Sequence, residues 1–283
     1  MKPPDFDYVA PTSVDGAIKA LGSDSEAKVL AGGQSLIPLL AFRLAGPSLL
    51  VDLARVDGLD HITDQGDRLV IGAMTRQRRV EQDPLVANRC PLLAESLRHV
   101  GHPQIRSQGT IGGSVAHADP AAELPGVVLA LGGRVHVTGP AGDRTIESEE
   151  LFQGFLSTSI ADGEILTAVE VPASGPRTGW SVVEVARRPG DYALCGALCQ
   201  LQLDDAGAVM GAHLGLIGVG DRPMRAYAVE AAVLAGANPA DAAELAPDGL
   251  SPSSDVHASS DYRLHLATVT SRRALTQALE RAA

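Results

Sequence analysis

Two glycine-rich segments constrain the fold of this chain more than any other feature of its sequence. The first, Gly32-Gly33-Gln34-Ser35, follows a short apolar run and precedes leucines at helical spacing. The second, Gly109-Thr110-Ile111-Gly112-Gly113-Ser114, leads into an alanine-rich stretch that is typical of a helix. Glycine lets the backbone turn sharply and lets a ligand approach it closely, and the N–H groups at a helix start attract phosphate. We therefore predict two phosphate-binding loops that converge on one diphosphate.

Each segment taken alone is also compatible with a simple tight turn. Neither has the GxGxxG spacing of a dinucleotide-binding fold, and neither continues into the GK[ST] of a phosphate-binding P-loop. The hydroxyls of Ser35, Thr110 and Ser114 could add hydrogen-bond donors to such a site. The two loops are therefore informative as a pair, and they leave the identity of the ligand open.

The charge balance argues against nucleic acid as a partner. The chain has 34 acidic and 23 basic residues, for a formal net charge of −11, and contains no basic block. Phosphate neutralisation along a nucleic acid needs clustered lysine and arginine. Aromatic side chains, which stack on bases, are scarce.

The three cysteines indicate that this chain carries no metal cluster of its own. Cys90, Cys195 and Cys199 form no CxxC pair, and an iron–sulfur cluster or structural zinc normally needs four ligands. We expect them to be small buried hydrophobic residues in a reducing compartment. The N-terminus has no apolar signal-peptide run and no stretch reaches the roughly 18 apolar residues of a membrane span. The prediction is a cytoplasmic protein.

Changes in pattern divide the chain into three parts, at residues 1–57, 58–174 and 175–283. The first part alternates helix and strand, with a helix capped at Thr12-Ser13 and strands near 29–31 and 48–53. The second begins with a hairpin over 61–71 and ends at the Pro- and Gly-rich stretch 172–176. The third part is predicted to contain long strands and then helices; we expect strands over 180–185, 197–203 and 208–219, and helices over 226–234 and 262–279.

Four motifs resemble one protein family along essentially the whole chain. Lys28–Leu36 and Thr110–Pro125 are similar to the two FAD-binding signatures of the flavoprotein (medium) subunits of molybdenum hydroxylases. The opening Phe6–Ser13 and the later Arg187–Ala193 match this family as well. The family includes bacterial carbon monoxide dehydrogenase, N-heterocycle dehydrogenases and the central part of xanthine dehydrogenase.

The resemblance implies an α+β fold. Residues 1–57 and 58–174 would be the two subdomains of an FAD-binding domain of the PCMH/vanillyl-alcohol-oxidase type, with FAD held non-covalently between them. Residues 175–283 would be a C-terminal α+β domain, an antiparallel sheet with helices.

The resemblance also implies site residues. Tyr192 would approach the isoalloxazine ring and is the candidate catalytic residue, Glu123 would contact the cofactor, and Leu166 would pack near it. The implied cofactor-binding set is Lys28, Ala31, Gly32, Gly33, Gln34, Ser35, Leu36, Thr110, Ile111, Gly112, Gly113, Ser114, Glu123, Leu166 and Tyr192. A flavin-tuning lysine of xanthine dehydrogenase aligns here with Val183, which leaves the electron acceptor open among NAD, a quinone and oxygen.

Some of these residues have structural interpretations that stay open. Glu123 could cap or solvate the helix that begins near it, and Tyr192 could be an ordinary turn residue. Asp119, which precedes Pro120, is expected to be a helix N-cap.

The implied function is electron transfer. The chain would be the FAD subunit of a molybdenum hydroxylase complex and would pass electrons from a partner's [2Fe–2S] clusters to an external acceptor. Its partners would be an iron–sulfur small subunit and a molybdopterin large subunit, in a dimer of heterotrimers. Two alternatives are a free-standing FAD-dependent oxidoreductase of the same fold and a non-catalytic nucleotide-binding module.

Overall fold

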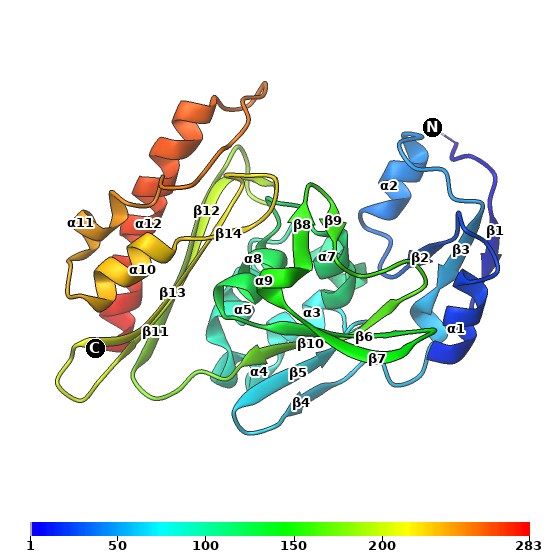
Figure 1. Ribbon diagram of the computed structural model, residues 1–283, viewed down its shortest axis with the longest axis horizontal. Coiled ribbons are helices and arrows are strands. Elements are labelled where there is room, and N and C mark those ends of the chain that lie inside the picture. The colour runs from blue at the N-terminus through cyan, green and yellow to red at the C-terminus, as the bar shows by residue number, and fades with distance from the viewer. Residues whose placement is uncertain (1) are drawn as a thin grey trace.

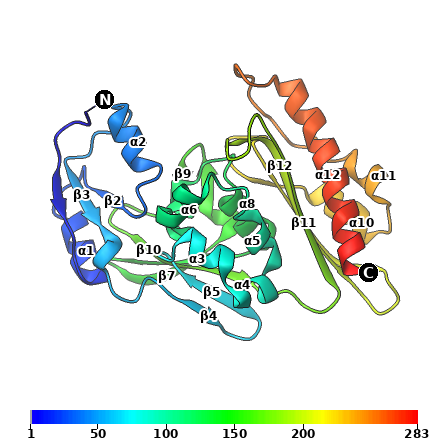
Figure 2. The same ribbon diagram turned by 180° about the vertical axis from the view of Figure 1, so that it is seen from behind.

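The computed structural model describes residues 2–283 and arranges them in three lobes along its longest axis (Figure 1). The N-terminal lobe and the C-terminal lobe lie at opposite ends, and the middle lobe separates them in both views (Figure 2). Each lobe contains its own sheet, which confirms the predicted α+β class. Among residues 2–283, no helix combines the length and the hydrophobicity that crossing a lipid bilayer would require.

The N-terminal lobe is built on a three-stranded parallel sheet with the order β1-β3-β2. Its elements are β1 (Asp7–Val9), α1 (Val14–Leu21), β2 (Lys28–Leu30), α2 (Leu36–Ala41), β3 (Leu49–Asp52) and a short 3₁₀ turn (Leu53–Arg55). Ser13 caps α1 by accepting the N–H of Gly16 at 3.1 Å, as its position in the sequence predicts. The chain leaves β2 directly into the first glycine segment.

The middle lobe contains a five-stranded antiparallel sheet with the order β4-β5-β10-β6-β7. Its strands are β4 (Ile62–Asp64), β5 (Arg68–Gly72), β6 (Arg134–Gly139), β7 (Gly142–Glu147) and β10 (Ile165–Pro172). A separate two-stranded hairpin, β8 (Phe152–Gly154) with β9 (Ser157–Thr158), follows α9 (Ser148–Leu151). The hairpin predicted over 61–71 is therefore confirmed as β4 and β5.

Short helices gather on one side of this five-stranded sheet (Figures 1 and 2). They are α3 (Gln77–Gln82), α4 (Pro84–Arg89), α5 (Pro91–Ser96), α6 (Pro103–Gln108), α7 (Ile111–His117) and α8 (Glu123–Ala130). Every residue of α8 is buried, so this helix lies in the interior of the molecule.

The C-terminal lobe is an antiparallel sheet covered by a long helix. The sheet has the order β11-β12-β13-β14, as a meander. Its elements are β11 (Thr178–Ala186), β12 (Ala193–Leu203), β13 (Val209–Ile217), β14 (Met224–Arg225), α10 (Tyr227–Leu234), α11 (Pro239–Ala243) and α12 (Ser260–Ala282). The long strands and the two terminal helices agree with those predicted from the sequence.

Glycines allow the helices on both faces of this sheet to approach it closely. A Cβ on Gly179 of β11 would lie 1.9 Å from the carbonyl oxygen of Ala278 in α12. On the other face, a Cβ on Gly126 of α8 would lie 2.5 Å from side-chain atoms of Leu198 and Ile217. The α8 helix therefore packs tightly against β12 and β13, and this contact fixes the start of α8 beside the C-terminal lobe.

Some local predictions were wrong in extent. The helix that follows the first glycine segment ends at Ala41, so Leu44 lies beyond it and is 75% exposed. The helices α4 and α6 were not predicted, although Pro84 and Pro103 each occupy a first helical position, where proline is favoured.

Candidate functional site

The first glycine segment forms a turn with free backbone donors between β2 and α2. Gly33 has φ +71°, which side-chain-bearing residues rarely adopt. Among residues 2–283, no protein atom accepts a hydrogen bond from the N–H groups of Gly33, Gln34 and Ser35. The Gln34 side-chain amide donates to the carbonyl oxygen of Gly32 at 3.1 Å and braces the turn. Consecutive free N–H groups of this kind form a concave anion-binding surface.

The second glycine segment is a helix rather than a loop, and this corrects the prediction. Thr110 is the N-cap of α7, and its hydroxyl accepts the N–H of Gly113 at 3.1 Å. The N–H groups of Ile111 and Gly112 donate to carbonyl oxygens at residues 75 and 73. The backbone donors at the start of α7 are therefore already used by the protein. This segment offers no free N–H groups at Ile111, Gly112 and Gly113, and its glycines instead allow other parts of the chain to approach closely.

The two glycine segments lie against each other. A Cβ on Gly32 would lie 2.4 Å from the carbonyl oxygen of Gln108 and 2.7 Å from the Cα of Gly109. A Cβ on Gly113 would lie 3.2 Å from the Cβ of Ala31. Segments about 80 residues apart in sequence thus meet where α2 of the N-terminal lobe faces α7 of the middle lobe (Figure 1). We call residues 31–36 together with 108–114 the cradle.

Tyr192 follows a loop that packs against the middle lobe. Gly190 has φ +86°, and a Cβ there would lie 2.8 Å from the ring of His102, just before α6. The Tyr192 side chain is large and 58% of the residue is exposed. Partial burial, and then the charges of Asp119 and Glu123, raise the pKa of Tyr192 to about 12, while the Ser35 side chain opposes the rise. Tyr192 therefore follows a loop that packs at the start of α6, the helix whose last residue, Gln108, belongs to the cradle.

Glu123 and Glu184 are buried acids, and sequence reasoning missed one of them. Glu123 is the first residue of α8 and is buried, as is the side chain of Glu184 in β11. Burial, and secondarily the charge of Asp119, raise the pKa of Glu123 to about 7. Burial and the charge of Glu123 raise the pKa of Glu184 to about 8. The signal that could have identified Glu184 is its position between valines in a predicted strand.

Lys28, Leu166 and Asp119 are not part of the cradle. Lys28 begins β2 and is exposed, three residues before Ala31, and so lies about 10 Å further back along the strand. Leu166 in β10 belongs to the core of the middle lobe. Asp119 is not the N-cap of α8, which is Ala122; its carboxylate accepts the N–H of Ala121 in the turn before the helix.

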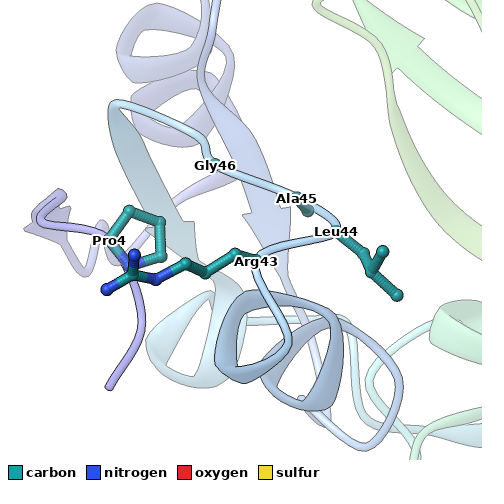
Figure 3. Close-up of a pocket in the computed structure, with 5 residues that line it drawn as sticks. All are labelled: Pro4, Arg43, Leu44, Ala45 and Gly46. Atoms are coloured by element: carbon teal, nitrogen blue, oxygen red, sulfur yellow. The ribbon is translucent and has the colours of Figure 1, made fainter. Parts of the chain in front are cut away.

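One hollow in the described part of the chain lies away from the cradle. It has a volume of about 450 Å³ and is lined by Pro4 and residues 43–46, beyond the C-terminal end of α2 (Figure 3). The Arg43 side chain extends toward Pro4, and Leu44 points the opposite way (Figure 3). One guanidinium on an open surface supplies too few polar groups for a built site, and we assign it no function.

The cradle fits one part of a flavin dinucleotide. Free N–H groups on the first segment match a diphosphate, and the absence of Cβ atoms at Gly32 and Gly113 lets the two segments come together beside those groups. An exposed tyrosine beside such a turn is placed to contact an aromatic ring. The fold and this site together define an FAD-binding oxidoreductase subunit.

Comparison with known proteins places the chain more narrowly. Residues 4–174 match the FAD binding domain in molybdopterin dehydrogenase, and residues 180–278 match the CO dehydrogenase flavoprotein C-terminal domain. The chain belongs to the family of FAD-containing medium subunits of molybdenum hydroxylases.

Individual relatives cover the full length. The chain is 41% identical to 6-hydroxypseudooxynicotine dehydrogenase complex subunit alpha of Paenarthrobacter nicotinovorans, over 100% of this chain and 97% of that protein. A solved carbon monoxide dehydrogenase from Hydrogenophaga pseudoflava, which lacks the Mo-pyranopterin moiety of its cofactor, has a chain that superposes with a TM-score of 0.97 at 36% identity and full coverage of both chains. Quinoline 2-oxidoreductase from Pseudomonas putida 86 gives a TM-score of 0.94 at 40% identity, over 100% of this chain and 99% of that one. The predicted family, fold and FAD cofactor are therefore confirmed.

Proposed function

We propose that this chain holds FAD non-covalently across the cradle and serves as the electron-relay subunit of a molybdenum hydroxylase complex. The observation that carries the proposal is that the two glycine segments lie against each other. The first has free N–H groups, and the second is a glycine-rich helix start that packs closely against it. When bound, FAD would supply two-electron storage that can be filled and emptied one electron at a time.

The protein's own residues would bind and orient the cofactor. The N–H groups of Gly33, Gln34 and Ser35 would donate to the diphosphate, and the helix cap at Thr110 would hold the opposing surface in place. Tyr192 would contact the isoalloxazine ring. We assign the FAD-binding half to residues 1–57 and 58–174 and the C-terminal domain to residues 175–283.

The partners follow from the same proposal. Relatives of this chain are named as medium subunits and as parts of enzyme complexes, and within residues 2–283 no cluster of histidine, cysteine and acidic residues could hold a metal ion. We infer an iron–sulfur subunit as electron donor and a molybdopterin subunit as the substrate-oxidising partner, in a dimer of heterotrimers. Three free, buried cysteines are compatible with a cytoplasmic location.

The test is Gly32→Ala, with Gly22→Ala as the matched control. The added Cβ at residue 32 would lie 2.4 Å from the oxygen of Gln108, so the two segments must separate, whereas at Gly22 the nearest atom is 3.5 Å away. Overpacking of this kind costs about 1–3 kcal/mol of folding stability. Because the diphosphate would contact the two segments in their close arrangement, we also expect weaker FAD binding.

FAD binding would be followed by titration of the flavin-free chain and by the flavin content of the purified protein. The control should bind FAD like the parent chain. Unchanged FAD affinity in Gly32→Ala would overturn the cradle assignment. A parent chain that binds no FAD at all would favour a nucleotide-binding module instead.

A further inference from the structure

A second hollow lies at the seam between the middle lobe and the C-terminal lobe, and none of its lining residues belongs to the cradle. Its volume is about 320 Å³, which is within the range of small-molecule sites. Figure 1 shows α9, which lines one side, in the middle lobe and α10, which lines the other, in the C-terminal lobe. We call this space, between Ser148 and Phe152 on one side and Arg222, Arg225 and Leu250 on the other, the seam hollow.

The seam hollow is lined by a buried hydroxyl that has nothing to bond to. Ser148 is the first residue of α9 and is 1% exposed, and its Oγ has no hydrogen-bond partner among residues 2–283. A serine at a helix start commonly caps the helix, but here Glu147 holds the N-cap position. A buried hydroxyl without a partner destabilises a fold, so folding alone does not account for this serine.

Arg225 brings a second unused donor to the seam hollow. Its Nε donates to the carboxylate of Glu230 at 2.9 Å, and its Nη2 lies 2.9 Å from the Nδ1 of His213. These contacts fix the guanidinium, which also lies over the ring of Tyr227, 5.1 Å from its centre. In the described part of the chain the Nη1 atom is 3.7 Å from the Oε1 of Glu149, too far for a hydrogen bond. The Nη1 of a fixed guanidinium is therefore free to donate to a ligand.

The other walls of the seam hollow are largely apolar. Leu129 and Phe152 are buried side chains of the middle lobe, and Met224 and Leu250 come from the C-terminal lobe. Apolar walls with a few placed polar groups are typical of sites for small organic molecules. The lining therefore suits a compact apolar body with one polar end.

The charges around the seam hollow favour a neutral ligand. Arg222 and Arg225 line it, and so do two acids, Glu149 and Asp248. A third acid, Glu230, pairs with Arg225 at 2.9 Å. Two cations and three acids leave no net positive charge to attract an anion. A cation, in turn, would meet the two free donors described above, where a neutral acceptor fits better.

We propose that the seam hollow binds a small neutral molecule with an apolar body and a carbonyl oxygen. The oxygen accepts hydrogen bonds from the Ser148 hydroxyl and from the Nη1 of Arg225, and the body packs on Leu129 and Phe152. A carbonyl oxygen has two lone pairs and can satisfy both donors. The site does not depend on the proposed FAD function, because it consists of residues outside the cradle.

The test uses acetophenone as the probe, with toluene and benzoate as matched probes that have the same ring and lack a neutral carbonyl. Each probe is titrated into the flavin-free full chain and followed by calorimetry. We expect acetophenone to bind at one site and more tightly than either of the others. Acetophenone that does not bind, or binds no better than toluene, would overturn the proposal. Tighter binding of benzoate would overturn the assignment of a neutral ligand.

A variant of Ser148 places the probe in the hollow. Ser148→Ala should weaken acetophenone binding about fivefold, the usual effect of one hydrogen bond, and should leave toluene binding unchanged. The matched control is Ser159→Ala, because the Ser159 hydroxyl is also buried without a partner among the described residues but lies outside the seam hollow. The control should bind acetophenone like the parent chain. Equal acetophenone affinity in Ser148→Ala and the parent would refute the site.

Urea unfolding separates this role of Ser148 from a structural one. Because neither hydroxyl has a partner within residues 2–283, both variants should unfold at the same urea concentration as the parent chain or at a higher one. A loss of affinity in Ser148→Ala then reflects the hollow itself. A clearly less stable Ser148→Ala would show that the hydroxyl serves the fold, and would overturn the proposal.

Discussion

Replacing Glu184 with glutamine should stabilise the flavin-free protein, and the gain should grow with pH. The pKa of Glu184 is raised from 4.5 to about 8 in the folded chain. Between these values the unfolded chain releases the proton and the folded chain keeps it, so the free energy of unfolding falls as pH rises. Below pH 4.5 both states hold the proton, and the penalty is absent.

The magnitude follows from the size of the shift. One pKa unit corresponds to 1.36 kcal/mol, so ionisation of Glu184 costs the folded state roughly 3–5 kcal/mol by pH 9. The total free energy of unfolding of a domain is about 5–15 kcal/mol, so the penalty for ionising Glu184 is a large fraction of that total. Glutamine has nearly the same shape and cannot ionise, and its buried amide adds an offset that does not depend on pH.

The assay is urea unfolding of both proteins at pH 5 and pH 9, followed by the fluorescence of Trp180, the single tryptophan of the chain. Trp180 donates to Glu95 at 2.9 Å where β11 meets the middle lobe, so it reports on that contact. The difference in unfolding free energy between the two proteins should be larger at pH 9 by roughly 3–5 kcal/mol. An equal difference at the two pH values would refute the reasoning.

Three further changes test other parts of the structure. Gly112→Val should destabilise the chain by about 1–3 kcal/mol or more in urea even without FAD, because a Cβ there would lie 2.5 Å from the Cβ of Ala73; an effect confined to FAD affinity would contradict this. Tyr192→Ala should change the rate at which bound flavin reacts with acceptors more than it changes FAD affinity, as stopped-flow oxidation and titration would show. Glu170→Gln should lower the free energy of unfolding at pH 7 by roughly 3–5 kcal/mol, because the Glu170 side chain is 2% exposed and its carboxylate is bonded to three basic groups. Unfolding curves indistinguishable from those of the parent would show that these ion pairs do not stabilise the fold.

Local signals in the sequence were sufficient for much of the fold. Ser13 before an amphipathic run predicted α1, and long apolar runs predicted the strands of the C-terminal meander. The same kind of signal marks the missed α4, where Asp83 caps the helix and Pro84 starts it. These elements depend on residues close together in the chain, and this is why they could be predicted.

The second glycine segment could not be predicted correctly, because long-range contacts determine its structure. Its donors at Ile111 and Gly112 bond to the carbonyl oxygens of Thr75 and Ala73, at the end of β5. A close approach to Ala73, rather than to a ligand, requires glycine at position 112. The motif predicted the family correctly, while the physical reason for one of its glycines lies inside the protein.

Two buried glutamates, Glu170 and Glu184, differ in whether basic side chains neutralise their charge. Glu170 is bonded to Arg68, Arg134 and His136 at 3.2 Å or less, and these contacts hold its pKa below the ordinary value, so its charge contributes to stability.

Glu184 is equally hidden, and no cation pairs with it in the part of the chain that the structure describes. Strand alternation puts it on the same face of β11 as Trp180 and Val182, which pack into the core of the middle lobe. An apolar residue there would stabilise the fold, so folding alone does not account for an acid at this position. Residues that break the local rules without a structural gain concentrate at functional sites, and Glu184 is such a residue.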